Sequence, residues 1–578
     1  MKKYIFIMLL LLTVVSISCD EDFLDRFPQD EISPQDYWKT PNDLKLYLNQ
    51  FYTSFPVHSG WSGGTFETDN NSDNLASFWI NERFVGNNST VPNTGGGWNW
   101  GSVRAINFYL ENNSDIEGSE EDIKHFNGEA YFFRAMIYFD LVKRFGDLPY
   151  IDKTLGTDSE ELYSERLPRN EVVDKIIADL DLAIANLKPR NNAENFRVHR
   201  GIALALKSNI CLYEGTWEKY HAGTTFAAET NNSQKYLQLA AEASNTLINE
   251  GNYTLYNTGN VDEDYRNLFI QQDYAGVSEV MLWKKYDKLD GVSHRVGHYI
   301  PRNGSGTGVT KSLVDSYLCT DGQPIAVSPL YTPELEKSLG TIASTRDPRL
   351  SQLICEPGNL ITDNGGINDD IFEFPTFRDN NEVICTTGFQ IYKGGTTDPT
   401  EREECEMGSI IYRYAEVLLN YAEAKAELGT LSQADLDKSI NLLRTRAGMP
   451  AMVIGSIVSD PNKAFPELSD LINEIRRERR VELALEGKRL DDLLRWRAHS
   501  QFVGKRLKGF KIVGSDLETE FSDLIGPTIL VDENGYIDPY KNTIPAGFGF
   551  NPERDYLSPI PTEQLVLSNG TLTQNPGW

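Results

Sequence analysis

The residues Gly60-Trp61-Ser62-Gly63-Gly64 match the G-x-S-x-G pattern around the nucleophilic serine of many hydrolases. That chemistry requires a strand before the serine and a helix after it. Neither is indicated, because residues 65–72 are polar and rich in Asn and Asp, and 45 glycines make a chance match common. Paired carboxylates could also cleave glycosidic bonds, but 84 acidic residues single out no pair. We therefore predict that the chain is not an enzyme.

Two other patterns bear on metal binding. His294 and His298 have the spacing of two ligands on one helical turn, but Gly297 and Pro301 argue against a helix there. The Asp/Asn-rich stretch 363–370 lacks the full EF-hand pattern and leaves open only a structural calcium ion. The sequence therefore predicts no catalytic metal and no cofactor.

The stretch from Asp69 to Trp100 carries the side chains best suited to hold a sugar. An aromatic ring packs against the apolar face of a pyranose while Asn, Asp and Arg hydrogen-bond its hydroxyls. The stretch is rich in Gly and Asn and weakly periodic, which is typical of surface loops that bind ligands. Local packing of the rings, or contact with a partner protein, is the alternative. The candidate ligand-binding residues are Asp73, Asn74, Trp79, Arg83, Trp98, Asn99 and Trp100.

The charge of the chain excludes some partners. It has 84 acidic and 55 basic residues, a formal charge of -29 and a pI near 4.7. Such a chain repels the phosphates of nucleic acids and anionic lipid surfaces. Neutral sugars carry no such penalty, so the composition permits a glycan ligand.

The N-terminus has the form of an export signal. Two lysines precede an apolar run too short to cross a bilayer, and small residues lead to Cys19. We predict a signal peptide over residues 1–18 and a lipid on Cys19, with an ordinary secreted protein as the alternative. The acidic residues after the cysteine favour display on the cell surface. The later cysteines form no C-x-x-C pair and are expected to be buried thiols; they are Cys211, Cys319, Cys355, Cys385 and Cys405.

Most of the first half of the chain shows helical periodicity. Apolar residues recur at spacings of three and four, with Gly or Pro between segments. The predicted helices cover residues 43–57, 102–112, 120–145, 170–188 and 197–220. By contrast, residues 255–405 and 505–578 are rich in Gly, Pro, Asn and Asp and predict loops with short strands, one of them over 278–283.

A helix-turn-helix unit lies within residues 409–450. A first helix is predicted from Ile411 to Leu428, and a second begins after the cap Ser432 and ends near Ala447. The unit is close in length to a tetratricopeptide repeat. A further helix, Arg476 to Arg489, is dense in Arg and Glu; its opposite charges predict an internal ion network rather than a basic binding surface.

Five blocks taken in order resemble the SusD/RagB family of outer-membrane lipoproteins, and the resemblance runs from Cys19 to Trp578. The blocks are Phe23 to Trp38, Arg134 to Pro149, Tyr412 to Ala424, Ile475 to Arg489 and Tyr556 to Trp578. Each block alone is a weak signal, but together they are highly specific.

This resemblance implies a mostly α, SusD-like fold, in which tetratricopeptide-like helix pairs support a loop-rich region with short strands. It implies one domain over 19–578, with a helical N-terminal part to about residue 250 that carries ligand loops and a C-terminal part from 251. It also implies sugar contacts from a second loop before Asp321-Gly322, whose candidates are His298, Tyr299 and Asn303.

The function implied is capture of a neutral glycan at the cell surface, without cleavage, and its delivery to a SusC-like TonB-dependent transporter. The protein would sit on the outer membrane through its lipid. A tetratricopeptide-like scaffold that binds peptide or protein is the alternative, because helix-pair repeats form concave protein-binding surfaces. Fold analogy does not identify the sugar.

Overall fold

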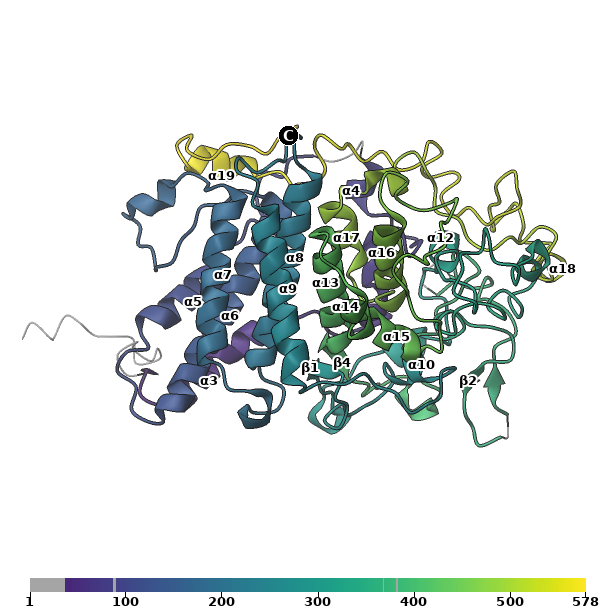
Figure 1. Cartoon of the computed structure of the whole chain (residues 1–578), viewed down its shortest axis with the longest axis horizontal. Coiled ribbons are helices and arrows are strands. Elements are labelled where there is room, and N and C mark those ends of the chain that lie inside the picture. Colours follow the sequence, from purple (N-terminus) through teal and green to yellow (C-terminus); the bar gives the residue numbers. More distant parts are fainter. Residues whose placement is uncertain (1–36, 87–89, 367, 381–382) are drawn as a thin grey trace, which may run out of the picture.

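The computed structural model describes residues 37–578 except 87–89, 367 and 381–382. Long helices occupy one side of the molecule, a second group of helices lies in the middle, and irregular chain with short elements fills the other side (Figure 1). The predicted mostly helical class is confirmed, and the strands of this described part form two small two-stranded sheets. None of its helices is both long and apolar enough to cross a membrane. The predicted signal peptide and Cys19 lie outside the described residues.

The predicted N-terminal helices are present at nearly the predicted bounds. They are α3 (Pro41–Leu48), α5 (Gly101–Glu111), α6 (Glu120–Phe145), α7 (Arg169–Asn186) and α8 (Arg200–Tyr220). The region after Leu48 continues as a 3₁₀ helix over Asn49–Ser54. A further long helix, α9 (Ser233–Glu250), was not predicted; its buried face combines three alanines with Tyr236, Leu237 and Leu247.

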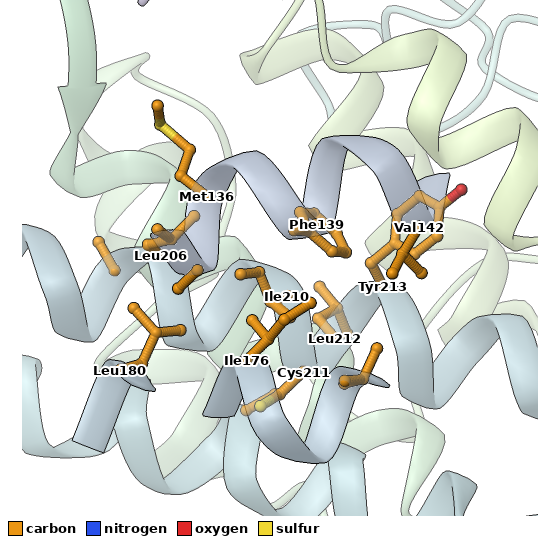
Figure 2. Packing of buried hydrophobic residues seen from close by; sticks show 14 of the residues in the cluster. Met136, Phe139, Val142, Ile176, Leu180, Leu206, Ile210, Cys211, Leu212 and Tyr213 are labelled. Atoms are coloured by element: carbon orange, nitrogen blue, oxygen red, sulfur yellow. The ribbon is translucent and has the colours of Figure 1, made fainter. Parts of the chain in front are cut away.

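The core of the helical half lies where α6, α7 and α8 meet. Phe139 and Val142 of α6 face Ile176 of α7 and Leu206 and Ile210 of α8 (Figure 2). Burial of these aliphatic and aromatic side chains stabilises the packing by about 1.5 to 3 kcal/mol per side chain. Because α6 carries apolar residues over much of its circumference, it must be covered on more than one side, and α3, α5 and α7 all pack on it.

The long helices are arranged as pairs that stack in a row. Helix α6 packs on α7, α7 on α8, and α8 on α9. The row continues with α13 (Tyr414–Glu427), which contacts both α8 and α9, and with α16 (Asp470–Glu482), which packs on α13. This is the tetratricopeptide-like arrangement that the sequence predicted.

The close approach of α8 and α9 depends on Gly215. A Cβ atom at this position would lie 2.9 Å from the backbone nitrogen of Leu237 and 2.8 Å from its Cγ atom. We expect Gly215→Ala to force the two helices apart and to lower the free energy of unfolding by about 1 to 3 kcal/mol, as overpacked cores do. Gly276→Ala is the control, since a Cβ there meets nothing within 4 Å. Chemical denaturation measures both, and equal stabilities would contradict the packing described.

The helix-turn-helix unit over 409–450 departs from the prediction in two places. Residues Ser409–Arg413 form strand β4, paired antiparallel with β1 (Val280–Lys284), so α13 begins at Tyr414 rather than Ile411. The second predicted helix is divided into α14 (Gln433–Asp437) and α15 (Ile440–Arg446). The division falls at Ser439, whose backbone is not helical and whose hydroxyl donates to the Asp435 carbonyl. The predicted cap at Ser432 is confirmed as a capping box with Asp435.

The remaining elements are short, and all but α4 and α17 lie in the loop-rich regions that the sequence predicted. The helices are α4 (Glu82–Val85), α10 (Asp264–Asn267), α11 (Val296–Tyr299), α12 (Lys311–Val314), α17 (Arg489–Arg495), α18 (Leu517–Glu520) and α19 (Thr562–Leu567). The second sheet pairs β2 (Leu360–Thr362) with β3 (Asp370–Ile371).

The Arg/Glu-dense helix both begins and ends earlier than predicted, at Asp470 and Glu482 instead of Arg476 and Arg489. Helix α16 ends at Glu482 and α17 starts at Arg489, because Leu485 and Gly487 between them have positive φ angles of 63° and 71°. The turn allows the Leu485 N–H to donate to the Asp69 carboxylate at 2.9 Å. The end of α16 is therefore attached to a segment four hundred residues away in sequence.

The predicted internal ion network is confirmed, but its partners come mainly from other elements. Glu482 is fully buried and lies within 2.6 to 2.8 Å of guanidinium nitrogens of Arg349, Arg413 and Arg446. Burial acts to raise the pKa of Glu482, but the three arginines outweigh it and hold that pKa well below its usual range. The five cysteines of the described chain are all buried and free, which confirms their prediction as structural thiols.

Candidate functional site

Two loop segments lie side by side, residues 60–79 and 294–310, and we call their contact the seam. At one end the Arg295 N–H donates to the Gly60 carbonyl at 3.1 Å. At the other end the Phe78 N–H donates to a carbonyl of the second segment at 2.8 Å. The seam therefore joins the two regions in which the sequence placed its candidate ligand residues.

Trp61 stands at the first end of the seam, with 64% of its surface exposed. The Arg295 guanidinium lies 3.6 Å from the centre of its ring, and the His298 ring packs edge-on at 5.8 Å. Arg295 and His298 are both held by the Glu403 carboxylate. The ring is thus positioned by a cation–π contact while much of it faces solvent.

Trp79 stands at the other end, with 60% of its surface exposed, next to the half-exposed Phe78. The two rings pack edge to face with centroids 5.6 Å apart. All nine tryptophans of the chain are described, and Trp61 and Trp79 are the two that the structure leaves mainly exposed. Each ring therefore offers accessible apolar surface to a ligand or partner.

Asp73 and Asn74, two of the predicted ligand residues, lie inside the protein. Arg489 binds the Asp73 carboxylate through two hydrogen bonds of 2.6 and 2.9 Å, and Arg480 approaches it at 3.2 Å. Burial acts to raise the pKa of Asp73, but the two arginines outweigh it and hold that pKa well below its usual range. Asn74 donates to Asp69 and accepts from Arg480. We therefore assign both residues to fixing the loop rather than to ligand contact.

Arg83 also has an internal partner. Its guanidinium donates to the backbone carbonyls of Asp555 and Tyr556, which attaches α4 to the C-terminal segment. These bonds use its Nε and Nη2 atoms, so the structure gives Arg83 a positioning role.

Trp98 and Trp100 line a different site, a groove of about 560 Å³ between α5, the loop 149–164 and α19. Both rings are half-buried, because Trp98 packs on Phe145 at 4.9 Å and Trp100 on Tyr138 at 5.9 Å. Asn99 is exposed, and its side chain accepts the Gly101 N–H at the start of α5. The structure thus separates these three residues from the seam.

The second predicted loop is only partly accessible. His298 is half-buried against Trp61, and Asn303 donates to the His298 carbonyl at 3.0 Å. Tyr299 is 8% exposed and belongs to the core of the loop-rich half.

Neither the hydrolase pattern nor the histidine pair forms a reactive centre. The Ser62 hydroxyl donates to the Ser59 carbonyl, and no strand precedes it within residues 37–61. Both ring nitrogens of His294 have backbone partners, and burial lowers its pKa to about 4. Within the described residues there is no group of three His, Cys, Asp or Glu side chains that could hold a metal ion.

Glu67 supports the loop that carries Trp61. Its carboxyl group folds over Gly63, where a Cβ atom would lie only 2.6 Å from it. Burial raises the pKa of Glu67 to about 7, against the opposing effects of the Gly63 N–H and the Ser305 hydroxyl. A carboxyl group with a raised pKa stays protonated in the folded protein while it ionises in the unfolded chain.

This shift predicts a pH-dependent effect of Glu67→Gln. As the pH rises from 4.5 to 7, Glu67 ionises more readily in the unfolded chain than in the folded protein, so the folded protein loses stability. Above pH 7 this loss of stability is complete. We expect the variant to match the wild type near pH 4 and to be more stable by about 1 to 3 kcal/mol at pH 8. Chemical denaturation at both pH values tests this, and an equal difference at the two would contradict it.

Several residues of the seam, and Glu403 beside it, were missed by the sequence analysis. Trp61 was treated only as part of the G-x-S-x-G pattern, and Phe78, Arg295 and Glu403 were not singled out. A tryptophan between glycines in a polar loop is a usable signal, because such a loop offers little apolar surface to cover the ring. The pairing of Arg295 with Glu403 crosses more than one hundred residues and has no local signature.

Known proteins resemble this chain over nearly all of its length. A family model described as the SusD family matches residues 294–578, and one described as starch-binding associating with outer membrane matches residues 22–212. SusD-like protein P2 of Formosa agariphila is 27% identical over 591 aligned positions, with both chains covered completely. SusD-like protein P38 of the same organism is 25% identical over 529 positions, 87% of this chain and 94% of that protein.

Solved structures share the fold. A SusD-like carbohydrate binding protein of Bacteroides fragilis superposes with a TM-score of 0.70 at 22% identity, covering 92% of this chain and 99% of that one. A second SusD-like protein of that organism also gives 0.70, at 23% identity, with 96% and 100% covered. At such identities the likeness establishes the architecture.

Proposed function

The chain belongs to the SusD family, and on this basis we propose that it is a non-catalytic, glycan-binding lipoprotein of the outer membrane. In this proposal Cys19 carries the lipid, the body of the protein faces the outside of the cell, and captured glycan passes to a SusC-like TonB-dependent transporter. Membership of the family supports the location and the ligand class. The carbohydrate-binding description of the Bacteroides fragilis relative agrees with it.

The observation that carries the ligand assignment is the pair of exposed tryptophans at the ends of the seam. A ring held by Arg295 on one side offers its remaining surface to the apolar face of a sugar. The half-buried His298 and the ion-paired Glu403 lie beside that ring and supply polar groups for hydroxyls. The exposed position of the two rings suits a long polymer, whose chain can pass across the surface without entering a pocket.

The groove lined by Trp98 and Trp100 is the second candidate location for the glycan. Its volume of about 560 Å³ lies within the range of small-molecule sites. The exposed Tyr163 and the Lys153–Glu161 ion pair provide polar groups at its wall. Glycan binding by variants of the seam tryptophans and of the groove tryptophans distinguishes the two locations.

Whole cells test capture and anchoring together. Cells that express the chain are expected to bind a fluorescent neutral polysaccharide, and Cys19→Ala should remove the protein from the membrane fraction and the label from the cells. Ser522→Ala, an exposed serine that lines neither tryptophan site, serves as the matched control. Full retention of the Cys19→Ala protein in the outer membrane would refute the lipid anchor. Binding of peptides but no glycan by the wild type would instead support the scaffold alternative.

A further inference from the structure

A cleft of about 270 Å³ lies between the long helices and the middle of the molecule. Helices α6 and α8 line one side of it, β4 and α17 line the other, and residues from 54 to 68 also contribute. None of the tryptophans at the seam or in the groove lines it. Its lining residues Ser54, Thr68 and Asp140 are exposed, so the cleft opens to solvent. It is therefore a separate and accessible site.

Charged side chains with accessible surface line this cleft. Lys143 binds Asp491 at 3.1 Å and Asp140 at 3.2 Å, and the three side chains remain 25%, 36% and 62% exposed, respectively. Lys143 contacts one oxygen of each carboxylate, and the second oxygen of each accepts no hydrogen bond within the described part of the chain. These oxygens are open to the hydroxyl groups of a ligand.

Tyr412 adds a hydroxyl without a partner to this group. The residue is half-buried, and its hydroxyl makes no hydrogen bond with any residue that the structure describes. Burial and the carboxylates of Glu416 and Asp140 raise the pKa of Tyr412. The hydroxyl therefore lies near the charged groups that line the cleft, where a ligand can accept its proton.

Aromatic side chains form the apolar part of the wall. Phe55 and Phe139 line the cleft and are almost fully buried. The Tyr412 ring packs edge-on against Phe55 with centroids 6.1 Å apart, and the Lys143 ammonium group lies 5.2 Å from the centre of the Phe139 ring. Apolar rings next to open oxygen acceptors match the two kinds of surface on a sugar, its C–H face and its hydroxyls.

The charge of the cleft favours a neutral ligand. Three carboxylates, those of Asp140, Asp491 and Glu416, face two ammonium groups, those of Lys143 and Lys488. The buried arginines that also line the cleft are all bound to carboxylates. An anion would add to this excess of negative charge, whereas a neutral sugar carries no such penalty.

From this geometry we propose that the cleft binds one neutral monosaccharide. Hydroxyls of the sugar donate to the open oxygens of Asp491 and Asp140, the Tyr412 hydroxyl donates to a sugar oxygen, and the C–H face of the sugar lies against the aromatic wall. The volume is just below the range of about 300 to 1,000 Å³ that drug-sized ligands occupy, so it suits a single sugar ring. This site is distinct from the exposed surface that captures a polysaccharide.

Calorimetry on the mature chain from Asp20 onward tests the proposal. Glucose, galactose, mannose and xylose are titrated separately, and glucuronate and galacturonate serve as charged counterparts of the first two. We expect saturable binding of one molecule per chain for at least one neutral sugar. A uronate should bind about fivefold more weakly than the neutral sugar with the same ring, because its carboxylate is repelled. Tighter binding of the uronates would overturn the assignment to neutral sugars.

Tyr412→Phe removes only the hydroxyl that would contact the sugar. The ring stays and no internal hydrogen bond is lost, so folding should be unaffected. Binding of the monosaccharide is expected to weaken about fivefold, the effect of one hydrogen bond. Tyr131→Phe is the matched control, because Tyr131 is a half-buried tyrosine of α6 that does not line the cleft, and it should bind as the wild type does.

Ser54→Trp obstructs the cleft from an exposed position. It is expected to weaken monosaccharide binding about tenfold or more and to leave capture of the polysaccharide unchanged, which separates this site from the capture surface. Ser522→Trp, at an exposed serine that does not line the cleft, is the control. The proposal is overturned if the wild type shows no saturable binding of any neutral sugar, or if folded Tyr412→Phe and Ser54→Trp both bind as tightly as the wild type.

Discussion

The double variant Trp61→Ala/Trp79→Ala is expected to bind the captured polysaccharide about 100-fold more weakly than the wild type. Each ring that stacks on a sugar contributes about 1.5 kcal/mol, and two such contacts add when the residues do not touch each other. Because 1.4 kcal/mol corresponds to a tenfold change in affinity, two lost contacts give roughly this factor. Calorimetry with a polymer long enough to reach both rings measures it.

Folding should be little affected by this change, because both side chains are mainly exposed. The single variants are expected to lose about tenfold each. The matched comparison is Trp98→Ala/Trp100→Ala, which removes two rings from the groove and should leave binding at the seam intact if the protein remains folded. If the groove variant loses binding while the seam variant keeps it, the ligand site must be moved to the groove.

Glu482→Ala is expected to lower the free energy of unfolding by about 3 to 5 kcal/mol, the largest effect on stability that we predict. The carboxylate is fully buried and compensates three arginines on different elements, Arg349, Arg413 and Arg446. Its removal leaves buried positive charges without a counter-charge, and the loss of one partner from a buried ion pair costs far more than the loss of an exposed pair.

Chemical denaturation of the wild type and of Glu482→Ala at pH 7 tests this expectation. Glu563→Ala is the control, because Glu563 is exposed on α19, and its free energy of unfolding should stay within about 0.5 kcal/mol of the wild type. If the two variants lose equal free energy of unfolding, or if neither loses any, the buried network does not hold the middle of the molecule together.

The helical half was predictable because local signals agree with the final packing. The bounds of α6 match the prediction, since an apolar face, an acidic first turn and Gly146 at its end all indicate the same helix. Helix α9 was not predicted; the three alanines of its buried face bury well only when a neighbour approaches closely, as α8 does at Gly215. The sequence does not show that neighbour.

Breaks within helices were harder to predict. Ser439 and Leu485 interrupt segments whose periodicity continues through them. In both cases the backbone leaves the helix at a hydrogen bond that involves a side chain. The Ser439 hydroxyl donates to the Asp435 carbonyl, and the Leu485 N–H donates to the Asp69 carboxylate. The second of these partners is distant in sequence, so tertiary structure outweighs local preference.

The candidate site was predicted mainly at the level of regions, with Trp79 and His298 as the seam residues that were named individually. The two loop regions that the sequence and the family resemblance indicated do meet along the seam. Residue type alone could not distinguish Asp73, which neutralises buried arginines, from a residue that faces solvent. Exposure is a property of the folded chain; it identified Trp61, which the sequence analysis missed, and it supports Trp79, which that analysis named.

The most direct test of the account is a calorimetric titration of the mature chain with a panel of neutral polysaccharides, each recovered afterwards and sized by chromatography. We predict saturable binding to at least one class of polysaccharide, with the chain length of the recovered polymer unchanged. Shortened products would show that the protein is an enzyme, and absence of binding to every polysaccharide would contradict the proposal that it captures glycans by itself.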